Sequence, residues 1–90
     1  MKYEWHRAKA AENLAKHGVS FEEAATVFRD PLSQTGLDPD HSLEEERFVM
    51  FGVSTRGRLL VVGHAERGDT IRIISARPAT PGERKIYEEG

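Results

Sequence analysis

Apolar residues recur at helical spacing near the start of the chain. This pattern predicts a helix over residues 7–17, with an apolar stripe made of Ala8, Ala11, Leu14 and Ala15. Gly18 then supplies the left-handed backbone conformation that commonly ends a helix. Ahead of this helix, residues 3–5 are compatible with a short first strand.

A second helix is predicted just beyond Gly18. Ser20 and Glu23 have the spacing of a capping box, in which each side chain bonds to the backbone N–H of the other residue. The apolar face that follows consists of Phe21, Ala24, Ala25 and Phe28. The pair Asp30–Pro31 ends the helix, because the residue before a proline is disfavoured in the helical region. Residues 31–43 then form a polar loop, with a candidate strand at Gln34–Leu37.

Three apolar runs follow the loop and have the lengths of strands, namely Arg47–Ser54, Leu59–Ala65 and Thr70–Ala76. Each gap between them is short and holds a glycine, which is typical of antiparallel hairpins. A capping box at residues 80–83, with Pro81 in the first helical position, then begins a closing helix. The predicted fold is therefore α+β: two N-terminal helices, an antiparallel β-meander of three to four strands and a short C-terminal helix.

The predicted sheet carries more apolar side chains than two N-terminal helices packed on one face can cover. Phe48, Met50, Phe51 and the run Leu59–Val62 supply this excess. An apolar face that the chain cannot bury by itself is typical of an interaction surface. We therefore expect either a homodimer or a complex with another protein.

Composition narrows the class of protein. Ninety residues fit one domain, and the absence of cysteine excludes disulfides and thiolate metal sites, as suits the reducing cytoplasm. The longest apolar runs, Phe48–Val53 and Leu59–Val62, are far too short to cross a membrane. The first six residues lack the apolar core of a signal peptide. We expect a cytoplasmic protein without a membrane association.

Charge is unevenly distributed along the chain. The formal net charge is −2, but residues 38–46 carry five acids and no base, whereas residues 47–85 carry eight bases against three acids. Seven of those eight bases are arginine, whose planar fork pairs with phosphate or carboxylate at two points. The second segment therefore favours an anionic ligand, although any single arginine is better explained as part of a solvated surface.

One candidate chemical site stands out in the last predicted strand. Arg72 and Arg77 interrupt its apolar residues, and strand alternation places them on one face only if the strand bulges or ends early. The structural alternative is that Arg72 pairs with a carboxylate such as Glu46, because a buried arginine is usually part of an ion pair. His64 and Trp5 are each better explained by packing than by chemistry. The sequence has no P-loop, dinucleotide fingerprint or metal-ligand spacing, so we expect no cofactor and no metal.

The chain resembles the BrnT family of toxins over residues 3–87. The resemblance rests on Trp5-x-x-x-Lys9-x-x-x-Asn13-x-x-Lys16-His17-Gly18-Val19-Ser20-Phe21-Glu22, Val27-Phe28-x-Asp30-Pro31, Glu46-Arg47 and Ile71-Arg72-Ile73-Ile74-Ser75-Ala76-Arg77. It implies a RelE-like fold, a ribonuclease activity that halts translation, and a BrnA antitoxin with a ribbon-helix-helix DNA-binding part. It also implies that DNA is bound only through the antitoxin, in an autoregulatory complex such as a toxin–antitoxin heterotetramer.

The resemblance implies metal-independent RNA cleavage, in which the 2′-hydroxyl attacks the adjacent phosphate. Arg72 and Arg77 would stabilise the charge on the phosphorane, since arginine is too weak an acid for proton transfer near neutral pH. The candidate acids and bases, among which the sequence does not choose, are Glu46, His64 and Tyr87. The candidate RNA-binding residues are Lys9, Lys16, Arg47 and Arg84.

A second hypothesis is a BrnT-like binding module without catalysis, which holds an antitoxin or a nucleic acid and acts in operon autoregulation. The acidic net charge favours it, and so does the closing helix, where Pro81-Gly82 replaces the basic residues usual in the family. The family usually also has Asp or Asn at the start of the first helix, where this chain has His6.

Overall fold

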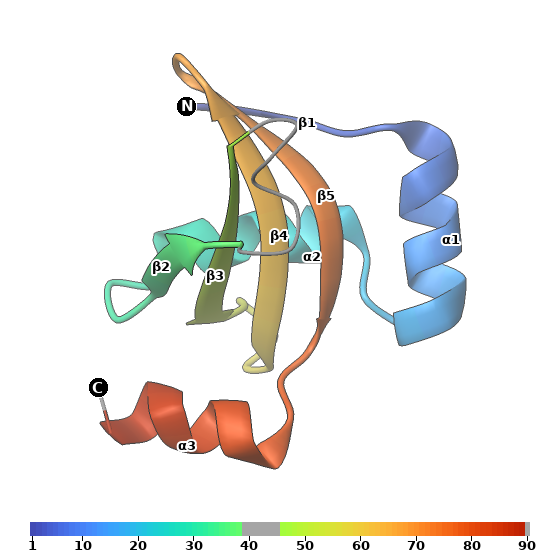
Figure 1. The fold of residues 1–90 in the computed structure, drawn as a ribbon. Helices are drawn as coiled ribbons and strands as arrows, with labels where there is room; N and C mark the ends of the chain where they lie inside the picture. The colour runs from blue at the N-terminus through green and yellow to red at the C-terminus, as the bar shows by residue number, and fades with distance from the viewer. Residues whose placement is uncertain (39–45, 90) are drawn as a thin grey trace.

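The computed structural model describes residues 1–38 and 46–89 (Figure 1). The elements in these ranges are β1 (Lys2–Glu4), α1 (Arg7–His17), α2 (Phe21–Thr26), the 3₁₀ turn η1 (Val27–Arg29), β2 (Gln34–Leu37), β3 (Arg47–Val53), β4 (Leu59–Arg67), β5 (Thr70–Pro78) and α3 (Pro81–Glu89). The described strands form one sheet in the order β1-β5-β4-β3-β2. The α+β prediction is confirmed, and the part of the predicted loop at residues 39–45 lies outside the described residues.

The predicted β-meander is present. Strands β2, β3, β4 and β5 follow one another in sequence and pair antiparallel with their neighbours. Tight turns join β3 to β4 and β4 to β5, and in each turn a glycine, Gly57 or Gly68, has a positive φ. The prediction of an entirely antiparallel sheet is wrong at one edge, because β1 pairs parallel with β5. Short strands at the far N-terminus give no sequence signal for their partner, so this pairing was not predicted.

The first helix has the predicted limits but a different buried side. Gly18 ends it with φ of 69° and donates its N–H to the Leu14 carbonyl. The predicted apolar stripe does not pack on the sheet, because Ala8, Ala11 and Ala15 are exposed and the Leu14 side chain is 51% exposed. The stripe interpretation was therefore wrong: α1 stands beside the β5 edge of the sheet (Figure 1) and not flat on its face.

Asn13 is the residue that attaches α1 to the rest of the molecule. Its amide nitrogen donates to the carbonyls of Val19 and Ala76, and its amide oxygen accepts from the Ala76 N–H. The side chain is buried, so these bonds are shielded from water. A single polar residue thus joins the helix both to the next turn and to β5.

The second helix, α2, is shorter than the helix predicted over residues 21–28. It covers six residues and then tightens into η1, and the Ser20 hydroxyl accepts from the Glu23 N–H at 3.0 Å as the capping box predicts. Its apolar face packs on one side of the sheet and forms the core. The members of this core are Val19, Phe21, Ala24, Val27, Leu60, Val62, Ile71, Ile73 and Ala76.

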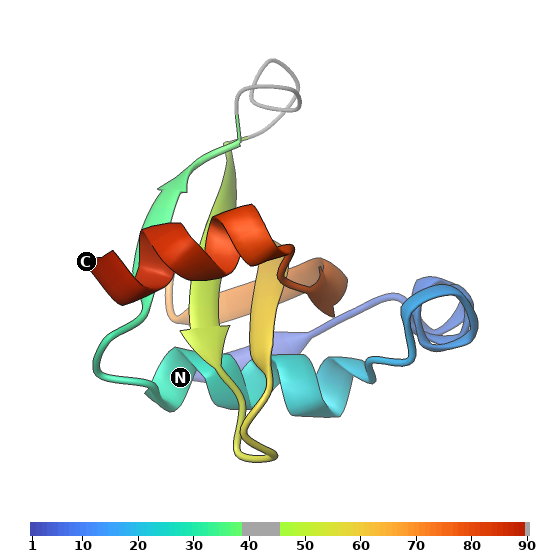
Figure 2. The ribbon, with the colours of Figure 1, turned by 90° about the horizontal axis from the view of Figure 1, so that it is seen from below.

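The closing helix lies on the other side of the sheet from α2. Figure 2 shows α2 and α3 on opposite sides of β3 and β4, with α1 to one side.

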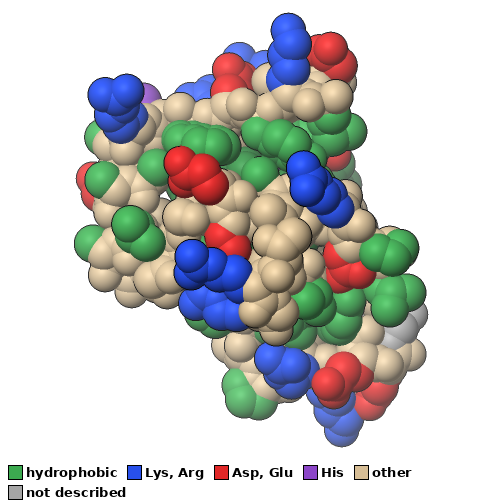
Figure 3. Space-filling view, turned by 180° about the vertical axis from the view of Figure 1, so that it is seen from behind, with side chains coloured by type: hydrophobic (Ala, Val, Ile, Leu, Met, Phe, Trp, Pro, Cys, Tyr) green, Lys and Arg blue, Asp and Glu red, His purple; other side chains and the backbone are tan. Residues whose placement is uncertain are grey.

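The run Leu59–Val62 is buried throughout, so the expectation that it would remain open for a partner is wrong. The side of the molecule on which α2 lies carries hydrophobic, basic and acidic side chains interspersed with one another (Figure 3). Of the described helices, none is long and apolar enough to span a membrane.

Candidate nucleic-acid interface

A bulge in β5 decides which way its arginines point. Gly63 of β4 pairs with Ser75 but His64 pairs with Ile73, so Ile74 is an extra residue in β5. In a regular strand, residues 72 and 77 would point to opposite faces. The extra residue restores Arg72 and Arg77 to the same face, which is the face away from α2. The sequence analysis required a bulge or an early strand end for Arg72 and Arg77 to share a face, and the structure has the bulge.

Arg72 lies in a row of side chains that crosses the sheet. Ala65 of β4 pairs with Arg47 on one side and with Arg72 on the other. Neighbouring strands are about 4.8 Å apart, so the two arginine Cα atoms are roughly 10 Å apart with only a methyl group between them. At Gly63, on the same side, the Ser75 hydroxyl occupies the place that a Cβ would take. Two cationic side chains thus rise on either side of a floor of small residues.

Helix α1 adds further cations beside this row. His6, Lys9, Arg47 and Arg72 line one hollow together with Ile73 and Ile74. Lys9 also lines the adjoining hollow, which extends along α1 to Lys16. We call the surface formed by His6, Lys9, Lys16, Arg47 and Arg72 the basic trough. Four of its five residues were predicted as RNA-binding or catalytic residues, and the structure brings these four together.

Arg77 lies farther along β5 and is engaged elsewhere. Its partner in β4 is Val61, four residues from the partner of Arg72, which separates the two arginines by roughly 13 Å along the strand. Its guanidinium donates to both Glu83 carboxylate oxygens, at 2.7 and 2.8 Å. This two-point pair raises the pKa of Arg77 and lowers that of Glu83 to about 2. Arg77 therefore ties α3 to the sheet.

Tyr87 makes a second attachment of α3. Its hydroxyl donates to Asp30 Oδ2 at 2.6 Å, and the same carboxylate accepts from the backbone N–H groups of Val53 and Leu32. The Asp30 carboxylate raises the pKa of Tyr87 to about 12, because ionised Tyr87 would lose the bond and face a like charge. Tyr87 thus connects α3 to the end of η1.

Comparison with known proteins identifies the family of this chain. Residues 5–83 match the family model described as the ribonuclease toxin BrnT of type II toxin–antitoxin systems. The chain belongs to the BrnT family of ribonuclease toxins. The search of curated proteins gave no match. Among solved structures, the ribonuclease toxin BrnT of Brucella abortus shares the fold, with a TM-score of 0.65 and 23% identity over 89% of this chain and 97% of that one.

In this BrnT family member, the acid and base candidates His64 and Tyr87 lie outside the trough, whereas Glu46 directly precedes the trough residue Arg47. His64 is buried between Phe28 and Phe48, with ring centroids 4.9 and 5.7 Å away, on the α2 side of the sheet. Tyr87 and the exposed Arg84 belong to α3. Glu46 is exposed immediately before β3. Of these four, only Glu46 is next in sequence to a trough residue.

The structure also answers the alternative interpretation of Arg72. Within residues 1–38 and 46–89, no ion pair joins Arg72 to Glu46 or to another acid. Sequence reasoning did not consider His6 as a site residue and treated it only as a weak helix cap. Its side chain makes no capping bond, and it lines the two hollows that Arg72 also lines. The position of His6 directly before α1, which carries Lys9 and Lys16, was the signal that could have identified His6 as a site residue.

A second network, which the sequence did not predict, fixes α2 to the β3–β4 turn. The buried Glu23 carboxylate accepts from the Ser54 hydroxyl at 2.7 Å and from Arg58 Nε at 2.9 Å. Arg58 also donates to the Gly18 carbonyl at 3.0 Å. Arg58 lowers the pKa of Glu23 although burial opposes this. Arg58, Glu23 and Ser54 therefore have a structural role in this family member.

The attachment of α3 by Glu83 should depend on pH. A carboxyl group with a pKa of about 2 in the folded state, against an ordinary 4.5, contributes stability above pH 4.5 that is lost as the pH falls towards 2. Both partners are partly exposed, so we expect Glu83→Gln to cost about 1 kcal/mol at pH 7, or roughly 5 °C in melting temperature. Thermal melting at pH 7 and pH 3 should show this difference shrinking in acid. An equal difference at both pH values would contradict the assignment.

Proposed function

We propose that this chain is an endoribonuclease that cleaves RNA laid in the basic trough without a metal ion, and that it thereby inhibits translation in the cytoplasm. The observation that supports this most is that Lys9, Arg47 and Arg72 line one hollow and that Lys16 lines the adjoining one. A phosphate backbone needs closely spaced cations, and arginine meets phosphate oxygens at two points. The net charge of −2 describes the whole chain, whereas the two hollows are lined by four Lys and Arg side chains and by one acid, Glu12.

The proposed reaction needs little covalent chemistry from the protein. The 2′-hydroxyl attacks the adjacent phosphorus, the bond to the 5′-oxygen breaks, and the products are a 2′,3′-cyclic phosphate and a 5′-hydroxyl. Arg72 and Arg47, on either side of Ala65, are placed to hold the non-bridging oxygens from two directions. Such donors act mainly as the charge on the phosphorane develops, which is where they lower the barrier.

The proton transfers require a different side chain. We propose His6, because it lines the hollow that holds Arg72 and because imidazole exchanges protons readily near neutral pH. Glu46, which precedes Arg47, is the second candidate. The packing of His64 and the bond between Tyr87 and Asp30 favour structural roles for those two residues. The engagement of Arg77 by Glu83 favours the same for Arg77.

The partner we propose is a BrnA-like antitoxin, which covers the trough and blocks RNA. The family to which the chain belongs is one of type II toxin–antitoxin systems. A cationic trough is best covered by an acidic segment, since opposite charges speed association and fix register. DNA would then be bound through the ribbon-helix-helix part of the antitoxin, in a toxin–antitoxin heterotetramer.

The test of this proposal measures both RNA cleavage by the purified protein and growth of cells that express it. The purified chain should cut a single-stranded RNA in the presence of excess EDTA, and the products should end in a cyclic phosphate. Induced expression should arrest growth, and co-expression of an adjacent ribbon-helix-helix gene should restore it. Tight RNA binding with no cleavage at any protein concentration would overturn the enzymatic proposal in favour of the binding module.

A further inference from the structure

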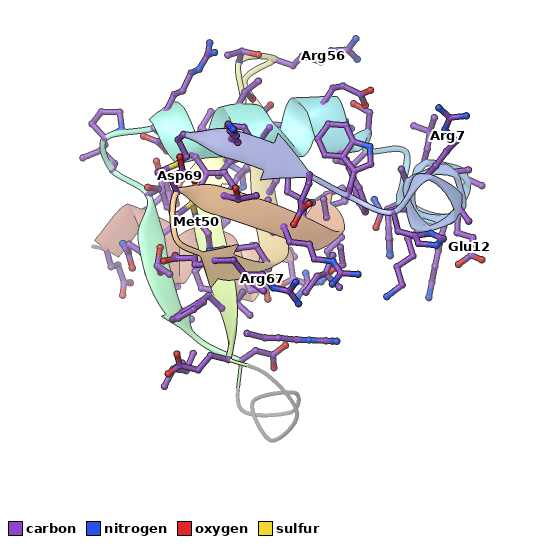
Figure 4. All side chains as sticks on the ribbon, turned by 90° about the horizontal axis from the view of Figure 1, so that it is seen from above. Arg7, Glu12, Met50, Arg56, Arg67 and Asp69 are labelled. Carbon is purple, nitrogen blue, oxygen red and sulfur yellow. The ribbon has the colours of Figure 1, made fainter. Side chains whose placement is uncertain are left out.

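A third hollow opens at the N-terminal end of the basic trough and contains an aromatic side chain. It is lined by Glu4, Trp5, His6, Arg67 and Arg72 and has a volume of about 240 Å³. Arg67 lies at the β4–β5 turn, on the side of the sheet away from α2 (Figure 4). Pockets that hold drug-sized ligands begin at roughly 300 Å³, so this hollow suits a single heterocycle. Arg72 belongs to both this hollow and the trough.

Trp5 provides a fixed aromatic surface in this hollow. Its indole meets the buried Phe21 ring edge-to-face, with centroids 6.0 Å apart and planes at 79°, and it stays only partly buried. An anchored, partly exposed indole is a platform on which an unpaired base stacks. Trp5 thus packs against the core and also lines the hollow. The sequence analysis predicted only its packing in the core.

Glu4 supplies an acceptor beside the cation that holds phosphate. It is the register partner of Arg72 in the parallel β1–β5 pair, its side chain is exposed, and no ion pair within residues 1–38 and 46–89 engages it. A carboxylate would only repel a phosphate there. The group it suits is a pair of adjacent N–H donors on a base, and guanine alone presents such a pair, at N1 and N2, on its Watson–Crick edge.

We propose that this hollow is a guanine-selective subsite, in which the base next to the cleaved phosphate stacks on Trp5 and donates two hydrogen bonds to Glu4. This inference rests on the proposed RNA cleavage, because Arg72 joins the subsite to the reacting phosphate. The other bases fit less well: adenine and cytosine present an acceptor beside their amino group, and uracil has one N–H between two carbonyls. Only guanine satisfies both carboxylate oxygens.

The first test needs no catalysis. Trp5 is the single tryptophan, so its fluorescence reports stacking directly. We expect 5′-GMP to quench it at a concentration about tenfold lower than AMP, CMP or UMP require. Glu4→Gln should remove this preference, whereas Glu88→Gln, at an exposed site on α3, should keep it. Equal quenching by all four nucleotides, or an unchanged preference in Glu4→Gln, would overturn the proposal.

The second test uses cleavage-site mapping on a mixed-sequence RNA. The wild-type chain should cut next to guanine about tenfold more often than next to other bases. Glu4→Gln should lose that bias, whereas the control Glu88→Gln should keep both the bias and the rate. Cleavage without a base preference would end the subsite while leaving the ribonuclease proposal standing. GMP-selective quenching without cleavage would overturn the ribonuclease proposal and leave the guanine subsite standing. Melting curves of both variants check that the fold is kept.

Discussion

Replacing Arg72 by alanine is expected to slow RNA cleavage about a hundredfold while the domain stays folded. Arg72 rises beside Ala65 on the open face of the sheet and has no acidic partner within residues 1–38 and 46–89. Its removal therefore leaves no buried charge unpaired. Loss of one charged donor to a developing oxyanion costs on the order of 3 kcal/mol of transition-state stabilisation. Initial rates on a labelled RNA and a melting curve of the same protein measure both quantities.

Two further variants sharpen this experiment. Arg72→Lys keeps the charge but loses the planar fork, so we expect it to restore only a small part of the rate. Arg56→Ala removes an exposed arginine from the β3–β4 turn, at the far end of the sheet, and should cleave at the wild-type rate (Figure 4). Cleavage at the wild-type rate by a folded Arg72→Ala protein would remove Arg72 from the mechanism.

Replacing Glu23 by alanine should have the largest effect on stability. The Glu23 side chain is 5% exposed and is the acceptor for both Arg58 and Ser54, so its loss leaves a cation and a hydroxyl without their partner. Breaking a buried ion pair costs roughly 3–5 kcal/mol, and we expect about 3 because Arg58 is 38% exposed and can turn to water. In a domain of this size, that lowers the melting temperature by roughly 15 °C.

The neighbouring residue offers a matched control. Glu22 lies in the same first turn of α2 but is exposed, so Glu22→Ala should change the melting temperature by only a few degrees. Both variants keep the basic trough, and the purified proteins should therefore cleave RNA at similar rates below their melting temperatures. Equal melting temperatures for the two variants would show that the Glu23 network does not hold α2 in place.

Local signals predicted the limits of most elements. The capping box at Thr80 forms in full, because the Thr80 hydroxyl accepts from the Glu83 N–H and the Glu83 carboxylate accepts from the Thr80 N–H at 2.9 Å. At Ser20 only the serine half forms, because the Glu23 carboxylate bonds to Arg58 and Ser54 instead. Gly18 and the two turn glycines have the positive φ values that their positions require. Each of these features depends on residues a few positions apart, so the chemistry that fixes it can be read from the sequence alone.

Contacts between distant segments were not predictable in the same way. The apolar stripe of α1 suggested one packed face, but the buried contact of that helix is Asn13, which bonds to Ala76 at a separation of 63 residues. The parallel pairing of Lys2–Glu4 with residues 70–72 has no local signature either. A single polar residue or a three-residue strand contributes too little to any periodicity to reveal its partner.

The candidate site shows both situations. The resemblance to the BrnT family suggested Lys9, Lys16 and Arg47, whereas Arg72 was suggested by its place within an apolar strand. Their arrangement depends on the strand register that sets Arg47 and Arg72 on either side of Ala65 and on the packing of α1 beside β5, neither of which has a local signal. The opposite occurred at Arg77, whose residue type suggested chemistry although the structure pairs it with Glu83. His64 packs between two phenylalanine rings, as the sequence favoured.

The parallel pairing of β1 with β5 has a consequence for how this protein is made. The trough takes His6 and Lys9 from the beginning of the chain and Arg72 from near its end, and the two parts meet only when β1 is laid against β5. A nascent chain emerges from the ribosome with its N-terminus first. Strand β1 and helix α1 of the growing polypeptide therefore leave the ribosome before β5 does, and the basic trough can form only after β5 has also emerged.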